Sequence, residues 1–287
     1  MNIKLATAAR EALAIQERGW YRLGNGTMVS IEKAQKKACE STNLYLPEDF
    51  DALWAALGTE VVLGETEITV EDASTLAAAR ELRKQYERVA LLNFASARNP
   101  GGGFLGGARA QEESLARASG LYSCLRTQPE FYEYHRALRS CLYSDRVIFA
   151  PDVPVFCDDH HLPLPEPFTV SMLTSAAVNV GALEKNEPQN LRFVRETMAH
   201  RTRMVLAVAA AHQIEALVLG AWGCGVFRCD PELVAELFAE ALDEPELKGR
   251  FSRITFAIIN PRSGPDKNIA SFERRFPPAD LNRSFFS

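Results

Sequence analysis

The sequence has no paired cysteine motif, no long apolar run and no excess of positive charge. Its six cysteines form no CxxC motif, and several lie within apolar runs, so we expect reduced thiols in a cytoplasmic protein. The apolar runs are too short to span a bilayer, and the first residues are too charged for a secretory signal, so we expect no membrane partner. A net charge of −5 disfavours an extended basic surface, and we expect no direct, sequence-specific binding of nucleic acid.

Common catalytic motifs are missing as well. No Gly-Lys-Ser/Thr of a Walker A loop and no GxSxG nucleophile elbow occurs. His160 and His161 follow Cys157 and two aspartates, but adjacent histidines cannot easily bind one tetrahedral metal, which disfavours a zinc site. Cys224 and Cys229 have no histidine nearby in the sequence, which disfavours a thiol nucleophile. We therefore expect neither a metal nor a cofactor.

Strand and helix signals alternate along most of the chain. A hydrophobic fraction of 47% is enough for a sizeable core and excludes a mainly disordered chain. We expect strands at residues 67–70, 88–94, 146–156, 168–173, 214–219 and 254–259, the last of which closes the sheet. We expect helices at residues 74–86, 114–126, 130–140, 190–212 and 230–242, and a loop at the proline-rich residues 160–167. This alternation predicts a three-layer α/β/α domain with a mostly parallel or mixed sheet.

The first 58 residues have a different pattern. An alanine-rich helix is expected at residues 5–18, a glycine turn at 24–26, a helix at 30–40 with Ser30 as its N-cap, and a short helix at 49–57. This segment is too small to be confidently independent. We predict an N-terminal helical extension at residues 1–58, which packs as a cover on a main domain at residues 59–287.

Residues 89–113 carry the strongest functional signal. A buried parallel strand is expected at residues 89–94, followed by a break at Asn99-Pro100 and a run of three glycines at residues 101–103. Gln111-Glu112-Glu113 then begins a helical pattern. A glycine loop between a strand and a helix start suits phosphate binding, because bare backbone N–H groups and the helix dipole both attract an anion.

Each part of this segment has a simpler interpretation when taken alone. A GGG run is most often a flexible turn, and adjacent glutamates at a helix start are usually surface residues that compensate the dipole. Their combination favours an active site, because carboxylates beside an anchored phosphate suit proton transfer.

A second glycine loop follows the strand expected at residues 214–219. Its glycines, Gly220, Gly223 and Gly225, stand in the wrong order for the dinucleotide-binding fingerprint. In open α/β sheets two such loops can face each other at the carboxyl ends of the strands. Phe227, at the end of the loop, taken alone is best interpreted as a core aromatic residue.

The order VALLNFASA, GGG, residues 104–110 and QEE resembles the signature of the poly(ADP-ribose) glycohydrolases. The resemblance is closest to the microbial type, a macrodomain-based family, and covers roughly residues 60–260, with the N-terminal region matching more loosely. It implies a macrodomain-like mixed sheet and an enzyme that hydrolyses ribose–ribose O-glycosidic bonds. Poly(ADP-ribose) or ADP-ribosylated proteins would be the substrate and ADP-ribose the product, with no cofactor and a role in the DNA damage response.

The resemblance also implies roles for single residues. Glu113 would be the acid/base, Glu112 would position the substrate hydroxyl, Gln111 would be a neutral orienting partner, and Asn99 would bind the terminal ribose. The second loop would embrace the diphosphate, and Phe227 would pack on the distal ribose. The complete set of expected ligand-binding residues is Asn99, Gly101, Gly102, Gly103, Gln111, Gly223, Cys224, Gly225, Val226 and Phe227.

The expected chemistry requires a particular pKa of the acid/base. One carboxyl group must protonate the leaving hydroxyl and then activate water, so burial or a neighbouring carboxylate should raise its pKa towards neutrality. Two alternatives stay open on the sequence: a hydrolase of mono-ADP-ribosylated substrates, and a non-catalytic ADP-ribose reader. A reader would need the glycine loops but not the glutamate pair.

Overall fold

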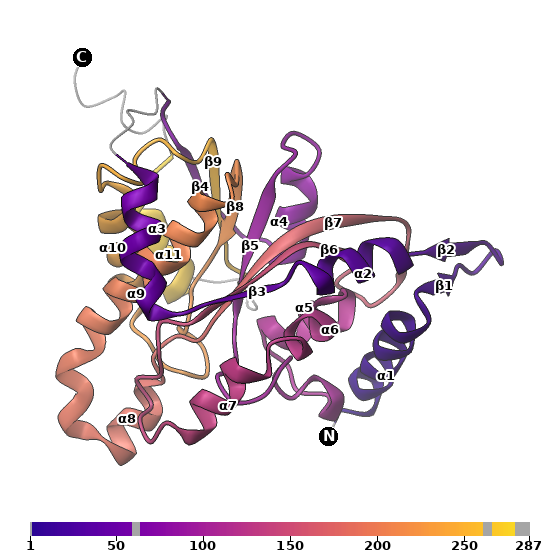
Figure 1. Cartoon of the computed structure of the whole chain (residues 1–287), viewed down its shortest axis with the longest axis horizontal. Coiled ribbons are helices and arrows are strands. Elements are labelled where there is room, and N and C mark those ends of the chain that lie inside the picture. Colours follow the sequence, from indigo (N-terminus) through magenta and orange to yellow (C-terminus); the bar gives the residue numbers. More distant parts are fainter. Residues whose placement is uncertain (1, 59–63, 261–265, 279–287) are drawn as a thin grey trace.

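A computed structural model describes residues 2–58, 64–260 and 266–278 (Figure 1). Its centre is a seven-stranded sheet in the order β3-β6-β7-β5-β8-β9-β4. The first three strands are antiparallel neighbours, and the pairings from β7 to β4 are all parallel. The strands of this sheet are β3 (Asn43–Tyr45), β4 (Glu67–Glu71), β5 (Val89–Phe94), β6 (Val147–Cys157), β7 (Pro163–Ser175), β8 (Ala216–Leu219) and β9 (Arg253–Ala257).

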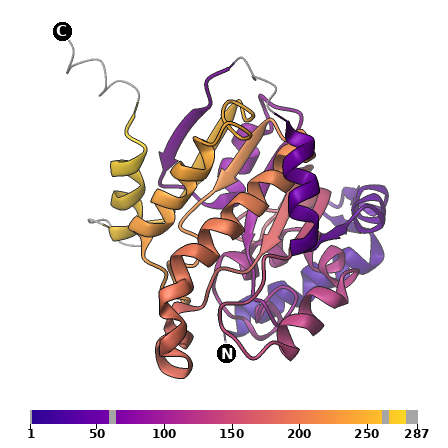
Figure 2. The ribbon, with the colours of Figure 1, turned by 60° about the vertical axis from the view of Figure 1, so that its left-hand side comes forward.

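Helices cover both faces of the sheet, because the central strands are apolar on both sides. In β5, Leu92 packs into one hydrophobic cluster with α3, α9, α10 and α11, while its neighbour Leu91 packs into the other cluster with α1, α2, α4, α5, α6 and α7. In Figure 2 the long α9 lies across the first of these faces. The helices are α1 (Ile3–Arg18), α2 (Glu32–Glu40), α3 (Phe50–Leu57), α4 (Thr75–Leu82), α5 (Gln111–Ala118), α6 (Leu121–Arg126), α7 (Pro129–Ala137), α8 (Val180–Asn186), α9 (Val194–Ala211), α10 (Pro231–Leu242) and α11 (Lys267–Arg275).

The predicted three-layer α/β/α arrangement with a mixed sheet is therefore confirmed. Local capping explains why several helices begin where the sequence predicts. The Ser74 side chain accepts a hydrogen bond from the Ala77 amide at the start of α4, and Asp230 accepts one from the Glu232 amide at the start of α10. None of the helices in the described ranges combines the length and apolar character of a membrane span.

The first 58 residues contain the three expected helices together with three strands that the pattern did not predict. β1 (Trp20–Arg22) and β2 (Met28–Ser30) form a hairpin around the predicted glycine turn. β3 pairs with β6 at the edge of the main sheet (Figure 1). The expected boundary at residue 58 adjoins residues 59–63, which lie outside the described residues, and the domain division stays a prediction.

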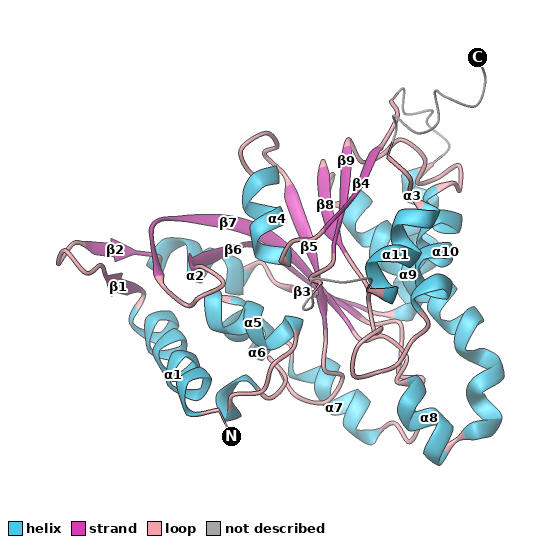
Figure 3. Cartoon of the chain, turned by 180° about the vertical axis from the view of Figure 1, so that it is seen from behind, coloured by secondary structure: helices cyan, strands magenta, loops and turns pink. Residues whose placement is uncertain are grey.

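The predicted loop at residues 160–167 is too long. β6 and β7 form a long hairpin that reaches towards β1 and β2 (Figure 3), and β7 already begins at Pro163. Prolines are tolerated here because β7 pairs with β5 only from Ser171 onwards, so few of its N–H groups are needed earlier.

Four further features differ from the sequence prediction. The helix expected at residues 114–126 is broken, because Ser119 is extended and forms a bridge with Val155 of β6. The first residues of the helix expected at 190–212 form a 3₁₀ turn, Pro188–Phe193. The N-cap of α2 is Ile31 rather than Ser30, and the edge strand of the sheet is β4 rather than β9.

Candidate active site

The two glycine loops begin at the carboxyl ends of neighbouring parallel strands. β5 leads into residues 95–110, and β8 leads into residues 220–230. Ser175, the last residue of β7, holds both loops through one carbonyl oxygen. This oxygen accepts hydrogen bonds from the Ala95 amide at 3.1 Å and from the Trp222 indole Nε1 at 3.3 Å. The structure therefore brings the two loops together at the sheet edge where open α/β folds bind ligands.

Glu113 lies against the first loop at the start of α5. One of its carboxyl oxygens, Oε1, accepts a hydrogen bond from the Gly103 amide at 2.9 Å. The other oxygen, Oε2, is buried and has no hydrogen-bond partner among the described residues. A buried carboxyl oxygen without a partner is costly, and such groups are concentrated at functional sites. The loop thus fixes one oxygen, while the second, buried oxygen has an unused capacity to accept a hydrogen bond.

Gly102 passes between the two glutamates. Its φ angle of +58° lies in the left-handed region that favours glycine. A Cβ atom at this position would lie 2.3 Å from Glu113 Oε1 and 3.1 Å from Glu112 Oε2. The close approach of the two carboxyl groups to the loop therefore requires a residue without a side chain.

Glu112 is almost fully buried and has a hydrogen bond to each carboxyl oxygen. Asn93 Nδ2 donates to Oε1 at 3.3 Å, and the Ser96 amide donates to Oε2 at 2.7 Å. Burial raises the pKa of Glu112 to about 8, although the hydrogen bonds from Ser96 and Asn93 lower it. The sequence argument expected a raised pKa at the acid/base, and the structure has this effect at Glu112.

Gln111 clamps α5 onto the end of β5. Its side-chain amide donates from Nε2 to the Leu92 carbonyl at 2.7 Å and accepts at Oε1 from the Phe94 amide at 2.8 Å. Nε2 also donates to Thr75 Oγ1 at 3.3 Å. These bonds occupy both ends of the amide, so Gln111 holds the helix that carries the glutamates. Its expected contact with a ligand stays a prediction.

Asn99 lies at the other end of the first loop. Its carbonyl accepts a hydrogen bond from the Gly102 amide at 3.0 Å and its own amide donates to Ser96 Oγ at 3.2 Å. Its side chain is exposed and has no hydrogen bond to any described residue. The asparagine amide is thus available for a ribose hydroxyl.

The N-terminal helix supports the first loop from outside. Phe104 is fully buried between Ala9 of α1 and Ala116 of α5. Gly107 has a φ angle of +78°, and a Cβ atom there would lie 2.5 Å from the Asn2 carbonyl oxygen. The loop is therefore packed between α1 and the helix of the glutamates.

The second loop is more open. Gly223 is crowded by Ala177 and Cys229, whereas Gly225 has open space where a side chain would be. Val226 is 81% exposed. Phe227 is half-buried, its ring lies 6.1 Å from that of Tyr143, and its carbonyl accepts a hydrogen bond from the Gly181 amide at 3.0 Å.

Cys224, between these residues, is partly buried, and its thiol donates to the Trp222 carbonyl at 3.7 Å. Burial raises the pKa of this thiol above its usual range. The thiol therefore stays protonated at neutral pH, which fits a loop residue rather than a nucleophile.

Comparison with known proteins identifies the family. The model of the catalytic domain of microbial-type poly(ADP-ribose) glycohydrolase (PARG) matches residues 9–158. A crystal structure of PARG from Thermomonospora curvata is 44% identical in sequence, covers 95% of this chain and 99% of its own, and superposes with a TM-score of 0.90. The chain belongs to the microbial-type PARG family. No curated protein sequence matches it significantly.

Other PARG structures match with bound ligands. The Thermomonospora curvata enzyme bound to the inhibitor ADP-HPD is 43% identical, with coverage of 95% and 99% and a TM-score of 0.87. The Deinococcus radiodurans enzyme in complex with ADP-ribose is 43% identical, covers 85% of this chain and 97% of its own, and has a TM-score of 0.79. The expected resemblance is thus confirmed, and it extends over most of the N-terminal segment, because the match to the PARG model begins at residue 9.

Sequence reasoning missed two residues of this PARG site. Asn93 is fully buried in β5, where its side chain donates to Glu112 and to Thr174 Oγ1 at 3.2 Å, and its Oδ1 atom has no partner in the described part of the chain. Ser96 donates its amide to Glu112. A polar residue inside the apolar run VALLNF was the signal that could have identified Asn93.

A buried arginine fixes the segment between the two loops. Arg201 of α9 donates to the Ala176 carbonyl at 2.8 Å, just after β7, and to the Leu142 carbonyl at 2.9 Å. Its Nε atom donates to Asp145 Oδ1 at 2.9 Å, and the same carboxylate interacts with His200 at 2.8 Å. Burial lowers the pKa of Arg201, and the carboxylate of Asp145 opposes this effect. The arginine therefore stabilises the segment that follows Ser175.

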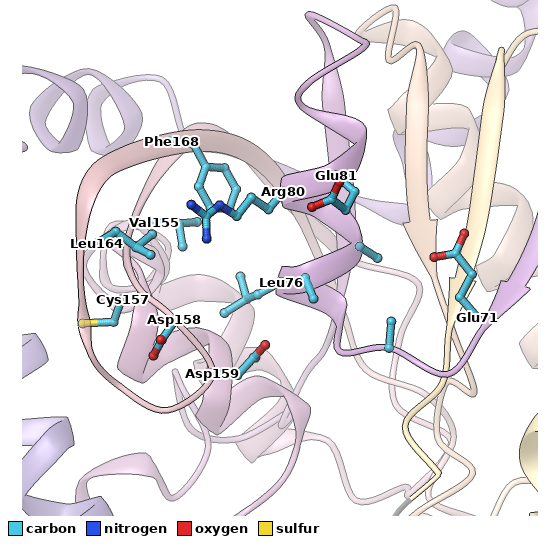
Figure 4. Close-up of a pocket in the computed structure, with 13 residues that line it drawn as sticks. Glu71, Leu76, Arg80, Glu81, Val155, Cys157, Asp158, Asp159, Leu164 and Phe168 are labelled. Atoms are coloured by element: carbon cyan, nitrogen blue, oxygen red, sulfur yellow. The ribbon is translucent and has the colours of Figure 1, made fainter.

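A cavity of about 240 Å³ lies outside this PARG site, between α4 and the β6–β7 hairpin (Figure 4). Leu76 of α4 and Val155, Leu164 and Phe168 of the hairpin line it. Glu112, Glu113 and the two glycine loops do not contribute to its walls. The cavity is therefore separate from the carboxyl groups of Glu112 and Glu113, although Thr75 of α4 contacts Gln111.

Proposed function

We propose that this protein hydrolyses the ribose–ribose O-glycosidic bonds of poly(ADP-ribose) and releases ADP-ribose. Glu113 acts as the acid/base, and Glu112 positions the substrate hydroxyl. The observation that carries the proposal is the asymmetry of Glu113, whose Oε1 is held by the Gly103 amide while its buried Oε2 has no partner among the described residues. A substrate hydroxyl or a water molecule would complete the coordination of this oxygen.

The glycine loops supply the anchor for the substrate. In the first loop, Gly101, Gly102 and Gly103 have no side chains, so the backbone there can approach the diphosphate of the terminal ADP-ribose unit closely. The second loop, from Gly223 to Phe227, supplies backbone N–H groups that bind this diphosphate. The Deinococcus radiodurans relative was crystallised with ADP-ribose, which supports this class of ligand. Asn99 binds the terminal ribose, and Phe227 packs against the distal ribose. Anchoring the unit at these points brings its glycosidic bond to the carboxyl group.

Hydrolysis then proceeds at one carboxyl group. Glu113 gives its proton to the leaving ribose hydroxyl while positive charge develops on the anomeric carbon. The diphosphate of the substrate stabilises this charge electrostatically. The Glu113 carboxylate next takes a proton from a water molecule, which attacks the anomeric carbon and releases ADP-ribose. Glu112, whose pKa of about 8 leaves it protonated at neutral pH, places no negative charge beside Glu113.

Incubation with two labelled substrates tests this function. Purified protein is mixed with poly(ADP-ribose) in one assay and with a mono-ADP-ribosylated protein in the other, and products are separated by chromatography. We expect shortening of the polymer and release of ADP-ribose. Cleavage of the mono-ADP-ribosylated protein alone would identify a mono-ADP-ribosyl hydrolase. Binding of both substrates without any cleavage would identify a reader.

The proposal includes a cytoplasmic location and a role in the DNA damage response. The cysteines support the cytoplasmic location, because none of the six forms a disulfide in the structure, as expected in a reducing compartment. Fractionation of cells with an antibody against the protein tests the location. A change in polymer lifetime after DNA damage in cells that lack the protein tests the role.

A further inference from the structure

Two cysteines far apart in the sequence meet where the N-terminal segment packs on the main domain. Cys39 lies in the last turn of α2, and Cys124 lies in α6. Their sulfur atoms are 3.8 Å apart, close enough for a hydrogen bond between them. Cys124 is completely buried, whereas Cys39 is partly exposed. The pair therefore joins one partly exposed cysteine to one that is completely buried.

A buried amide lies over both sulfur atoms. Gln35 Nε2 donates to Cys39 Sγ at 3.2 Å and is 3.8 Å from Cys124 Sγ. The same Nε2 atom donates to the Gly120 carbonyl at 3.1 Å. Gly120 cannot be replaced without moving this amide, because a Cβ atom there would lie 1.9 Å from Gln35 Oε1. The packing of α2 against α6 thus fixes a hydrogen-bond donor beside the pair.

We propose that Cys39 and Cys124 form an oxidation site at which a hydroperoxide joins α2 to α6 by a disulfide. Cys39 is the attacking residue because it is the partly exposed member of the pair, whereas Cys124 is completely buried. Cys124 is the resolving sulfur because it already lies in contact with Cys39. A disulfide needs a sulfur–sulfur distance of about 2.0 Å, so the two side chains must approach further by rotation about their χ angles.

The surroundings of the pair suit this division of roles. The hydrogen bond with Cys124 is the largest effect on Cys39 and lowers its pKa to about 6, with a further contribution from Gln35, against burial and the charge of Glu40. The hydrogen bond with Cys39 raises the pKa of Cys124, and burial adds to this effect. Oxidation of Cys39 to a sulfenic acid removes the negative charge of its thiolate. The largest effect that raises the pKa of the Cys124 thiol is then lost.

The reaction proceeds in two balanced steps. The Cys39 thiolate attacks one peroxide oxygen, the O–O bond breaks, and Cys39 becomes a sulfenic acid as hydroxide leaves. The hydroxide becomes water by taking up the proton that the Cys39 thiol had released. The Cys124 sulfur then attacks the Cys39 sulfur, the S–O bond breaks, and a second water leaves with the proton of Cys124. Two thiols are oxidised and one hydrogen peroxide molecule is reduced to two waters. A thiol reductant reverses the change.

The test uses the full-length protein and hydrogen peroxide at one to five equivalents. After quenching and alkylation, intact mass and peptide mapping report the state of each cysteine. We expect the protein to lose two of its six free thiols, with a crosslink between the peptides of Cys39 and Cys124 that dithiothreitol reverses. The oxidised protein should also melt about 5 °C higher, because the disulfide closes a long loop.

Three variants separate the roles. Cys39→Ser should abolish the fast loss of thiols, and Cys124→Ser should leave Cys39 as a sulfenic acid that dimedone traps. The matched control Cys141→Ser removes another partly exposed thiol and should keep the crosslink. All six thiols surviving the treatment, or a crosslink that uses other cysteines, would overturn the proposal. Peptide mapping of the peroxide-treated protein without substitutions tests the Cys39–Cys124 crosslink directly, even where a variant folds poorly.

Discussion

The two glycine loops of this PARG differ in how they are held. The first loop lies between two buried carboxyl groups and a helix of the N-terminal segment, and its Gly102 and Gly107 have left-handed backbone conformations. The second loop is fixed at Trp222 and Cys229 but is open at Gly225 and Val226. A rigid loop suits the bond to be broken, whereas an open loop suits a ligand that must enter and leave. The comparison therefore supports the proposal that the first loop serves the chemistry and the second loop serves binding.

Removing the acid should give the largest effect. Glu113→Gln keeps the size of the side chain and a carbonyl oxygen for the Gly103 amide, but it cannot donate and take back a proton as a carboxyl group does. We expect poly(ADP-ribose) hydrolysis to fall by at least about 10³-fold, with the dissociation constant for ADP-ribose within about threefold of the unmodified protein. A chromatographic chain-length assay and calorimetric titration measure the two quantities.

Glu112→Gln is the comparison that separates the acid from the positioning residue. It should also reduce the rate strongly, but the remaining activity should follow the pH profile of the unmodified acid. A fully active Glu113→Gln enzyme would remove Glu113 from the mechanism.

Adding a methyl group to each loop should distinguish the roles of the two loops and give the second-largest effect. Gly102→Ala places a Cβ atom 2.3 Å from Glu113 Oε1 at a φ angle of +58°, so either the carboxyl group or the loop must move. We expect a loss of about 10²-fold in kcat/KM, because a displacement of about 1 Å at a catalytic group has effects of this size. Steady-state hydrolysis of the polymer measures it.

Gly225→Ala is the matched control on the second loop. Its Cβ atom would meet no atom within 4 Å, so the free protein should fold normally and kcat should stay within about threefold. Equal losses of kcat in both variants would contradict the division of roles between the loops.

The first loop could be predicted from the sequence because the strand, the glycines and the glutamates that define it follow one another along the chain. A strand, a glycine run and a pair of glutamates at a helix start are local patterns, and each is fixed by backbone conformation or by the helix dipole. The second loop was readable for the same reason. The order of these parts also carried the family resemblance, which the match to the PARG model confirmed.

The contacts between the elements that form the site could not be predicted from the sequence. Asn93 meets Glu112 because β5 and α5 pack together, and Ser175 at the end of β7 accepts hydrogen bonds from both loops. Such contacts depend on the register of strands that are distant in the sequence, as does the edge pairing of β3 with β6. The hydrogen bonds of the Gln111 side chain to Leu92 and Phe94 could not be predicted for the same reason, since they form only in the folded chain.

Stability should depend on pH through Glu112. Its pKa rises from 4.5 to about 8 on folding, so the folded state holds the proton more tightly than the unfolded state does. This contribution to stability is fully present below pH 4.5 and is lost as the pH rises towards 8. Relative to Glu112→Gln, the unmodified protein should lose about 2 to 3 kcal/mol of unfolding free energy between pH 5.5 and 7.5.

Urea unfolding of both proteins at the two pH values measures this difference. The glutamine variant serves as the control for every other titrating group, because the two chains differ only at position 112. If the difference in unfolding free energy between the two proteins is the same at both pH values, the folded state does not hold the proton of Glu112 more tightly than the unfolded state does.

The smallest expected effect tests the second loop at its exposed end. Phe227→Ala removes a half-buried ring that lies 6.1 Å from Tyr143, and its backbone carbonyl keeps the bond from Gly181. Because the ring would pack on the distal ribose only in the complex, we expect the dissociation constant of ADP-ribose to rise about tenfold, with kcat nearly unchanged at saturating polymer. Calorimetry and initial rates separate the two, and Val226→Ala, which shortens a side chain that is 81% exposed, is the neighbouring control. A loss confined to kcat would instead place Phe227 with the glutamates, and the contrast between a chemical loop and a binding loop would then no longer hold.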